Sequence, residues 1–427
     1  MRSFDPRPPL SVSVVAGDQG RAIFLCETLQ DVGLDACAAD FAKTSDVLLF
    51  DLHSCPPDLA AEMAEHASTQ DGRRPLTAAL GFFDADDAQD PIVDIRFSSD
   101  AALIAAPMRI EFARRAATRR AEAELRRESF ARFGCKTPSE AENSSRKVLF
   151  VGDASALFPT LSNGLADQDL TLTAAFSTYS AFDFLHEDQF AAVIVDGGAD
   201  WVRPGSFCAM VRRSPSLTEL PIAAILPVGA DLDDDLATNA TDMIEDDAPT
   251  HAMVRQIVNL IEDAAPTRRD LTAPQDAIAD DLTALFSREF FEDHLERQIA
   301  WSETFGQPLT LAAFRLRVSR DKDGGRDIAH AAHVVKSLLR MQDVPTRLDT
   351  DLIGVSMPGA TFAGAHGAAR RIAGVLDVTA FDAGDASPAV QVGVDWRIVE
   401  RRRGQTAQEF IRSALEGGPF ERGVVAA

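Results

Sequence analysis

The chain is poor in cysteine and has no long apolar run. Its five cysteines are Cys26, Cys37, Cys55, Cys135 and Cys208, and no two of them form a C-x-x-C spacing. This pattern indicates reduced thiols in a cytoplasmic protein rather than disulfides. No apolar run is long enough to span a bilayer, and residues 1–10 lack the apolar stretch of a signal peptide. We therefore expect a soluble cytoplasmic protein with no membrane insertion.

Basic residues are also scarce. The 427 residues include 42 Lys and Arg against 66 Asp and Glu, which gives a formal net charge of −24. Such an excess of negative charge argues against binding to nucleic acid or to a membrane surface. The imbalance is uneven, because residues 280–427 hold 18 basic and 21 acidic residues, and residues 1–279 hold the other 24 and 45. An anionic ligand is therefore best accommodated in the last third.

Apolar residues make up 46% of the chain, enough for the cores of two to four domains. Residues 10–132 carry strand-length apolar runs with a helical pattern between the first two, "LSVSVVAG", "DVLLFDL" and "PLTAAL". Residues 146–265 repeat the plan with "KVLFVGD", "AAVIVDGG" and "PIAAIL". Alternating strands and helices predict an α/β fold, here two doubly wound, flavodoxin-like domains with parallel sheets.

Two segments separate these blocks from the rest. Residues 109–134 form an Arg/Glu/Ala-rich stretch that predicts a long helix closing the first block, with a solvated face and i,i+4 ion pairs. Residues 265–279 are rich in Pro, Ala and charge and are expected to link the second block to a third, residues 280–427.

Carboxylates stand at the predicted strand ends of the first two blocks. Asp51 and Asp196 end the run after the first helix, and Asp18 and Asp153 follow the first run. This pattern resembles the receiver domains of response regulators. The resemblance makes Asp51 and Asp196 candidate phosphoacceptors and Asp18 and Asp153 candidate weak Mg²⁺ ligands, since clustered carboxylates suit that ion.

Both blocks depart from the receiver pattern at three positions. A second acid beside the first strand, a Ser or Thr at the end of the fourth strand, and a Lys before a Pro after the fifth are all replaced. The replacements are Gly17 and Gly152, Leu80 and Leu226, and Ala106 and Ala248, in that order. Without the lysine a phosphoryl group loses a charge-assisted partner. Each block is therefore either a docking module or a phosphoacceptor that lacks part of its site.

The third block opens with a motif-like segment. Its matching positions are Asp280, Leu282, Thr283, Leu285, Arg288 and Phe291. Up to about residue 415 the block resembles the GGDEF domain of diguanylate cyclases. The resemblance implies a nucleotidyl-cyclase-like α/β domain with an antiparallel central sheet and flanking helices.

The catalytic part of that resemblance is missing. The five signature positions read Asp349, Thr350, Asp351, Leu352 and Ile353. The family's two glycines, which let the backbone approach phosphate, are replaced here. Leu352 stands where the family has a metal-binding glutamate. The preceding strand carries Arg315 where the family places another metal ligand, and a cation cannot hold Mg²⁺. We therefore expect no diguanylate cyclase activity.

A second feature of the family is kept. Arg340 and Asp343 form an Arg-x-x-Asp pair five residues before the signature, and Arg371 stands on the following helix. In the family these positions bind cyclic di-GMP. Arginine forks suit phosphate oxygens and the guanine N7/O6 edge, and a carboxylate can accept from the other guanine edge. An isolated Arg-x-x-Asp can equally be a surface ion pair at a helix end.

Taken over its length, the chain resembles PopA-like cyclic di-GMP effectors, paralogues of the cyclase PleD with two receivers and a degenerate GGDEF domain. The resemblance implies a non-enzymatic receptor in two-component and cell-cycle signalling, a homodimer recruited to a cell pole. Its protein partners are an adaptor of the RcdA type, the regulator CtrA and the protease ClpXP. Two alternatives remain: a weakly active or phosphorylation-controlled cyclase, and a scaffold without a nucleotide ligand.

Overall fold

The computed structural model describes residues 10–39, 45–55, 75–82, 93–135, 145–214, 216–271, 278–317, 324–381 and 390–422. Its packing divides the chain into two compact units. The first comprises Met1–Ala117 with Glu142–Ala265, and the second comprises Thr118–Ala141 with Pro266–Ala427. Among the described residues, no helix combines the length and apolar character needed to cross a membrane.

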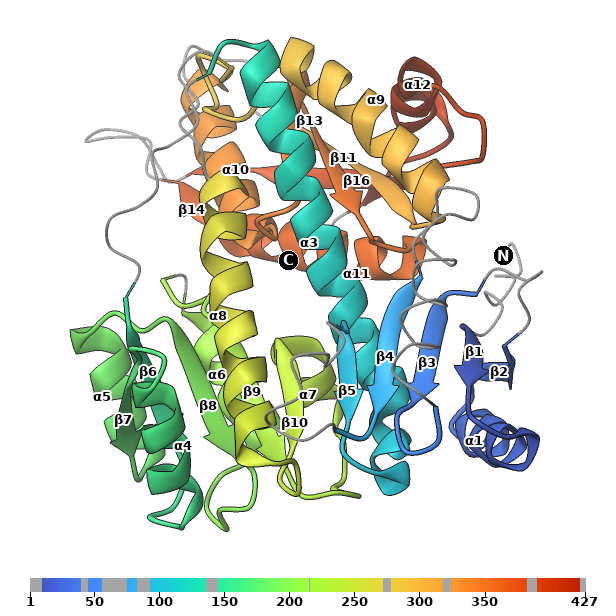
Figure 1. The fold of residues 1–427 in the computed structure, drawn as a ribbon. Coiled ribbons are helices and arrows are strands. Elements are labelled where there is room, and N and C mark those ends of the chain that lie inside the picture. Colours follow the sequence, from blue (N-terminus) through green and yellow to red (C-terminus); the bar gives the residue numbers. More distant parts are fainter. Residues whose placement is uncertain are drawn as a thin grey trace. The chain divides into compact units, whose positions relative to one another are not determined.

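The first sheet is five-stranded and parallel, with strand order β2-β1-β3-β4-β5 (Figure 1, blue to cyan). Its elements are β1 (Ser11–Val15), α1 (Gln19–Asp31), β2 (Asp35–Ala38), β3 (Val47–Asp51), β4 (Leu76–Leu80) and β5 (Ile95–Phe97). The three runs predicted as strands are confirmed, and the structure adds β2 and β5. The 3-10 helix η1 (Asp100–Ala105) and the long helix α3 (Ala106–Arg132) follow.

The second sheet repeats this topology, with order β10-β9-β8-β6-β7 and all strands parallel. Its strands are β6 (Lys147–Val151), β7 (Thr171–Ala175), β8 (Ala192–Asp196), β9 (Ile222–Leu226) and β10 (Asp242–Glu245). The helices are α4 (Leu157–Ala166), α5 (Thr178–Glu187), α6 (Pro204–Arg213), α7 (Asp234–Asn239) and α8 (Thr250–Leu271). The predicted repeat of a doubly wound plan is therefore correct at the level of topology.

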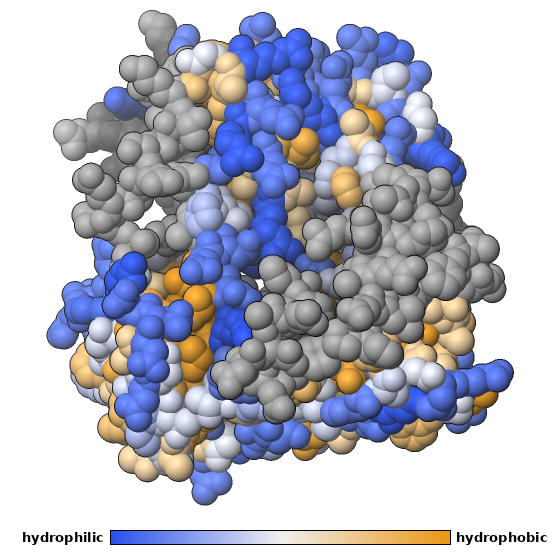
Figure 2. Space-filling view, in the orientation of Figure 1, coloured by the Kyte–Doolittle hydropathy of each residue, from blue (hydrophilic) through white to orange (hydrophobic). Residues whose placement is uncertain are grey.

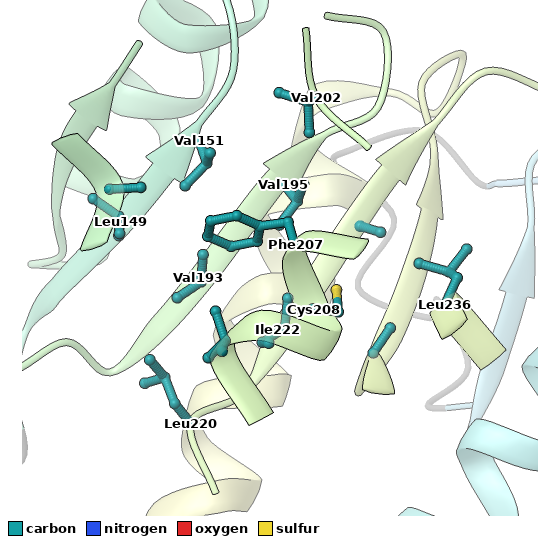
Figure 3. Packing of buried hydrophobic residues seen from close by; sticks show 14 of the residues in the cluster. Leu149, Val151, Val193, Val195, Val202, Phe207, Cys208, Leu220, Ile222 and Leu236 are labelled. Carbon is teal, nitrogen blue, oxygen red and sulfur yellow. The ribbon is translucent and has the colours of Figure 1, made fainter. Parts of the chain in front are cut away.

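Both faces of the second sheet are buried, which explains its continuous apolar strands. Along β6, Leu149 and Val151 join one core and Val148 and Phe150 join the other, since side chains alternate between the faces of a strand. Figure 3 shows the first of these cores, where Phe207 lies among valines of neighbouring strands.

The third sheet is antiparallel among the described residues, in the order β12-β13-β11-β16-β17. Its strands are β11 (Leu309–Arg317), β12 (Val344–Asp349), β13 (Leu352–Pro358), β16 (Gly393–Glu400) and β17 (Glu421–Arg422). The helices are α9 (Arg288–Phe305), α10 (Gly324–Leu338), α11 (Phe362–Val378) and α12 (Ala407–Glu416), and a short pair is formed by β14 (Ala380–Phe381) and β15 (Val390–Gln391). The predicted antiparallel sheet with flanking helices is confirmed.

The two faces of this sheet are covered by different helices. Ala312 and Phe314 of β11 pack into a cluster that includes residues of α10 and α11. Leu311 and Ala313 pack into another cluster with residues of α9 and α12. Phe130 of α3 belongs to this second cluster, and its ring stacks on Phe290 at 5.5 Å. The last turns of α3 are therefore part of the third block's core.

The two linking segments match the expectations only in part. The Arg-rich helix is not solvated throughout, although Figure 2 shows hydrophilic residues along its visible side. Arg109 and Arg126 are each only 2% exposed, because they form buried ion pairs with Glu245 and Glu122. The predicted linker at residues 265–279 begins inside a helix, since α8 continues through Pro266 to Leu271. The three predicted domain ranges remain a prediction, and the packing assigns the end of α3 to the second unit.

Candidate functional site

The Arg-x-x-Asp pair lies in the short turn between α10 and β12. The backbone N–H of Asp343 donates to the carbonyl of Arg340 at 3.0 Å, and the backbone N–H of Arg340 donates to Asp343 Oδ2 at 2.9 Å. Asp343 is only 7% exposed, whereas Arg340 is exposed. Burial raises the pKa of Asp343 to about 6, and the positive charge of Arg340 opposes this shift. The turn thus combines an exposed arginine with a largely buried carboxylate.

Arg371 comes to the same place from α11. Its Nη2 donates to the carbonyl of Leu338 at 3.1 Å, at the end of α10 and two positions before Arg340. Helix carbonyls at a C-terminus lack partners within the helix, and a basic side chain stabilises them. The structure therefore brings the three predicted ligand residues together, and both Arg340 and Arg371 are exposed to solvent.

The degenerate signature occupies the hairpin between β12 and β13. Asp349 pairs with Leu352, so Thr350 and Asp351 form the turn. Asp349 Oδ1 accepts from the Thr350 N–H at 2.7 Å, and this bond holds the pKa of Asp349 below its usual value. Leu352 is 3% exposed and Ile353 is fully buried. Two of the five signature positions therefore supply core side chains rather than ligands.

Arg315 lies on β11 directly opposite Leu352 on one side and Asp395 on the other. Its guanidinium carbon lies 4.3 Å from the centre of the Phe420 ring, and that of Arg397 lies 4.1 Å from the same ring. Arg317, two residues further along β11, forms an ion pair with Asp395. The strand that was expected to lack a metal carboxylate is thus bordered by three guanidinium groups.

In the first block a cation already neutralises the candidate phosphoacceptor. Asp51 ends β3 and is fully buried. Arg21 Nε donates to Asp51 Oδ2 at 2.9 Å, and Nη1 of the same arginine donates to Asp100 Oδ2 at 2.6 Å. Ser54 Oγ donates to Asp51 Oδ2 at 2.6 Å. Burial alone would raise the pKa of Asp51, but the bonds from Arg21 and Ser54 hold it below its usual value.

Among the described residues of the second block, no cation contacts Asp196. Its carboxylate Oδ1 accepts from the Gly198 N–H at 2.9 Å. Burial raises the pKa of Asp196, the Gly198 bond opposes the shift, and the charges of Asp153 and Asp246 add to it. Asp153 Oδ1 itself accepts from the Trp201 indole at 2.6 Å. Asp18, its counterpart in the first block, caps α1 by accepting from the Arg21 N–H.

Close packing explains the glycines that replace a second acid. A Cβ at Gly17 would lie 2.0 Å from the Ser54 carbonyl oxygen, and a Cβ at Gly152 would lie 2.4 Å from the Cβ of Asp196. Neither position has room for a carboxylate side chain unless the backbone moves. Within the described parts of the chain, no group of three or more His, Cys, Asp or Glu side chains is arranged to hold a metal ion.

The other receiver positions lie mostly as expected. Leu80 and Leu226 are the last residues of β4 and β9 and are buried. Ala248 follows β10 before Pro249. Ala106 was misplaced, because η1 separates it from β5 and it begins α3 instead. The residue that sequence reasoning missed is Arg21, whose charge near Asp18 was visible in the sequence but whose partner was not.

Comparisons with known proteins give weak similarities only. No family model matches the chain, and a search of curated proteins finds no match. Among solved structures, the GGDEF domain of DgcB from Caulobacter crescentus in complex with c-di-GMP is 18% identical, with a TM-score of 0.31 over 34% of this chain and 86% of that one. The GGDEF domain of FimX from Pseudomonas aeruginosa is 17% identical, with a TM-score of 0.30 over 32% of this chain and 89% of that one.

A receiver-sized match also occurs. A protein named as a response regulator from Chloroflexus aurantiacus is 20% identical, with a TM-score of 0.26 over 28% of this chain and 99% of that one. These identities and TM-scores are low, so the similarities by themselves assign no function to this chain.

Proposed function

We propose that this protein is a non-catalytic receptor for cyclic di-GMP, with Arg340, Asp343 and Arg371 as the residues that contact the ligand. The observation that supports it is the convergence of two exposed arginines and one carboxylate on the end of α10, from two separate segments of the chain. Cyclic di-GMP offers two phosphodiesters and two guanines. Guanidinium groups bind both kinds of group, and they also stack on purine faces.

In this proposal the ligand contacts the largely buried Asp343 carboxylate at Oδ1, because Oδ2 already accepts from the Arg340 N–H. The ionised form of this group accepts hydrogen bonds, so binding should improve as pH rises through the Asp343 pKa of about 6. Charged hydrogen bonds contribute about 1.5–3 kcal/mol each when shielded from water. Three of them are consistent with binding in the micromolar range, near −8 kcal/mol.

The degenerate signature supports a receptor rather than an enzyme. Leu352 is buried where the family carries a carboxylate, and Arg315 stacks on Phe420 beside it. A divalent metal would meet positive charge at this strand instead of a ligand. By resemblance, the receptor role extends to recruiting partner proteins for regulated proteolysis, with the receiver-like blocks as docking modules, as a homodimer at a cell pole.

Calorimetry with cyclic di-GMP tests the proposal directly. We expect wild-type protein to release or absorb heat with a saturable isotherm, and Arg340→Ala to weaken binding at least tenfold, since it removes a charged hydrogen-bond donor. Arg370→Ala is a matched control, because Arg370 is an exposed neighbour on α11 without an assigned ligand role. No binding by the wild type, or equal binding by Arg340→Ala, would reject the site.

Incubation with GTP and Mg²⁺ tests the alternative. Formation of cyclic di-GMP by the purified chain would overturn the non-catalytic proposal and favour a weakly active cyclase. Saturable cyclic di-GMP binding without product formation is the expected result.

A further inference from the structure

Arg126 of α3 contacts three separate segments with its guanidinium. Nε donates to Glu122 Oε1 at 2.7 Å, Nη1 to the carbonyl of Leu271 at 2.9 Å, and Nη2 to the carbonyl of Asp343 at 3.0 Å. Leu271 is the last residue of α8, and Asp343 belongs to the candidate ligand site. The side chain is buried, so these bonds are shielded from water. One residue therefore joins two helices to the Arg-x-x-Asp turn.

A buried polar network fixes the direction of this guanidinium. Glu122 also lies 2.8 Å from His294 Nε2 through its Oε1, and its Oε2 accepts from Gln298 Nε2 at 2.8 Å. The other ring nitrogen of His294 lies 2.9 Å from Ser129 Oγ. Burial opposes ionisation of Glu122, but His294 and Arg126 outweigh it and hold the pKa of Glu122 below its usual value. The carboxylate is therefore ionised and orients Arg126.

An aromatic ring also lies against the guanidinium of Arg126. The ring of Phe286 has its centre 5.5 Å from the guanidinium carbon, and a planar guanidinium can lie against such a ring while it donates at its edges. A lysine at this position would carry the charge on a single nitrogen and could not donate along the three directions that the arginine uses. The geometry is therefore specific to arginine.

The two helices that end here come from the preceding blocks. α3 begins after the first sheet and α8 begins after the second, and both have their last turns in the second compact unit. The carbonyl of Leu271 lies at the C-terminus of α8, where helix carbonyls need an outside donor. Any change that moves the Asp343 turn must therefore alter a bond shared with the ends of these helices.

We propose that Arg126 is a positioning residue that couples occupancy of the Arg340–Asp343 site to the ends of α3 and α8. This inference rests on the proposed function, because it assigns regulation to that site. Cyclic di-GMP contacting the Asp343 carboxylate stabilises the turn whose backbone carbonyl accepts from Arg126. By thermodynamic linkage, the order of the helix ends then affects ligand affinity by the same factor as the ligand affects that order.

The test compares the full-length wild type with Arg126→Lys and Arg127→Lys. Arg127 is the matched control, because it is the next residue on α3, is half exposed, and lies 3.6 Å from Asp270 at the end of α8. It has no described bond to the Asp343 turn. Calorimetry gives the cyclic di-GMP affinity, and hydrogen exchange gives the ligand-induced protection of amides in residues 262–271 and 122–132.

We expect Arg126→Lys to bind cyclic di-GMP about tenfold more weakly or worse and to lose the ligand-induced protection of the α8 end. Arg127→Lys should retain both. A change in folding alone would alter protection with and without ligand equally, so the ligand-dependent difference separates positioning from general stability. Equal affinity and equal ligand-induced protection in Arg126→Lys would overturn the coupling while leaving the proposed receptor intact.

If the wild type does not bind cyclic di-GMP, both the receptor proposal and the coupling are overturned. This result differs from failure of the coupling alone, in which the wild type still binds. If Arg126→Lys does not fold, Glu122→Gln decides the question, because it keeps the shape of the side chain and removes the charge that orients Arg126. Weaker binding and reduced protection by Glu122→Gln would support the coupling. Wild-type behaviour would overturn it.

Discussion

The first two sheets share one topology but treat their strand-end carboxylates in opposite ways. Asp51 is fully buried with the guanidinium of Arg21 against it, and its pKa is lowered. Asp196 stands at the same place in the second sheet, no described residue brings a cation into contact with it, and its pKa is raised. The repeated fold therefore fixes the position of the acid, while neighbouring groups determine the direction in which its pKa shifts.

This difference bears on whether either block can accept a phosphoryl group. In the first block Arg21 supplies the positive charge that Mg²⁺ and a lysine would otherwise supply, and it holds Asp51 and Asp100 together. In the second block the charge of Asp153 repels that of Asp196, and no cation from the described residues lies in contact with Asp196. Phosphorylation of Asp51 or Asp196 stays a prediction.

The largest expected effect comes from removing the internal cation. Arg21→Ala leaves Asp51 buried and without its ion-pair partner, and we expect the free energy of unfolding to fall by about 3 kcal/mol. Urea denaturation measures it. The matched change in the second block is Trp201→Phe, which removes the indole donor to the exposed Asp153 and should cost less than about 1 kcal/mol. Equal effects of the two variants would mean that the two acid sites do not differ.

Neutralising each carboxylate sharpens the same contrast. Asp51→Asn removes the charge that binds Arg21, so we expect a loss of about 1.5–2 kcal/mol in the free energy of unfolding. Asp196→Asn keeps an acceptor for the Gly198 N–H and removes a buried charge, so its effect should stay within about 0.5 kcal/mol. Chemical denaturation of the two variants at neutral pH checks this. A larger loss from Asp196→Asn than from Asp51→Asn would contradict the assignment of charge.

The two carboxylates should also give opposite pH dependences. The lowered pKa of Asp51 means that its stabilisation is present above the ordinary value of 3.8 and is lost as pH falls below it. The raised pKa of Asp196 means that the folded state holds a proton more tightly, so stability falls as pH rises from 3.8 through the raised value.

Denaturation of the wild type and both Asn variants between pH 3 and pH 7 measures this difference. The advantage of the wild type over Asp51→Asn should shrink as the pH decreases below 3.8. Its advantage over Asp196→Asn should shrink as the pH increases above 3.8. Parallel curves for the wild type and Asp196→Asn would show that the Asp196 pKa is not raised.

The smallest expected effect is that of added magnesium. Arg21 already neutralises Asp51. We therefore expect millimolar Mg²⁺ to change the melting temperature of Asp51→Asn by the same amount as that of the wild type. If Mg²⁺ raises the melting temperature of the wild type slightly, this rise should be absent in Asp196→Asn. The reason is that Asp196 and Asp153 carry like charges and, among the described residues, no cation neutralises Asp196. Thermal melts with and without Mg²⁺ test this prediction. A Mg²⁺-induced rise that is lost in Asp51→Asn but kept in Asp196→Asn would contradict it.

The sequence itself determined the three central strands of each of the first two sheets, whereas the antiparallel third sheet was expected from a family resemblance. Apolar runs of strand length predicted β1, β3, β4, β6, β8 and β9, since strands buried on both faces must be apolar throughout. The hairpin at Asp349 and the Arg-x-x-Asp turn were located by the family resemblance, and local hydrogen bonds form both of them. Arg371 was expected as a ligand residue from the family resemblance, and only the structure shows that it bonds the carbonyl at the end of α10.

Only the tertiary structure decided which arginines are buried and what they hold. In the helix of residues 109–134 the pattern predicted i,i+4 pairs, and Arg115 with Glu111 is such a pair. Arg126 with Glu122 has the same spacing, yet it is buried and bonded to the Asp343 turn. Arg21 likewise reaches Asp51 across 30 positions of sequence. Charge and spacing are local properties of a chain, whereas burial and a distant acceptor depend on how separate segments pack. This packing therefore determines how strongly each charged group interacts with its partners.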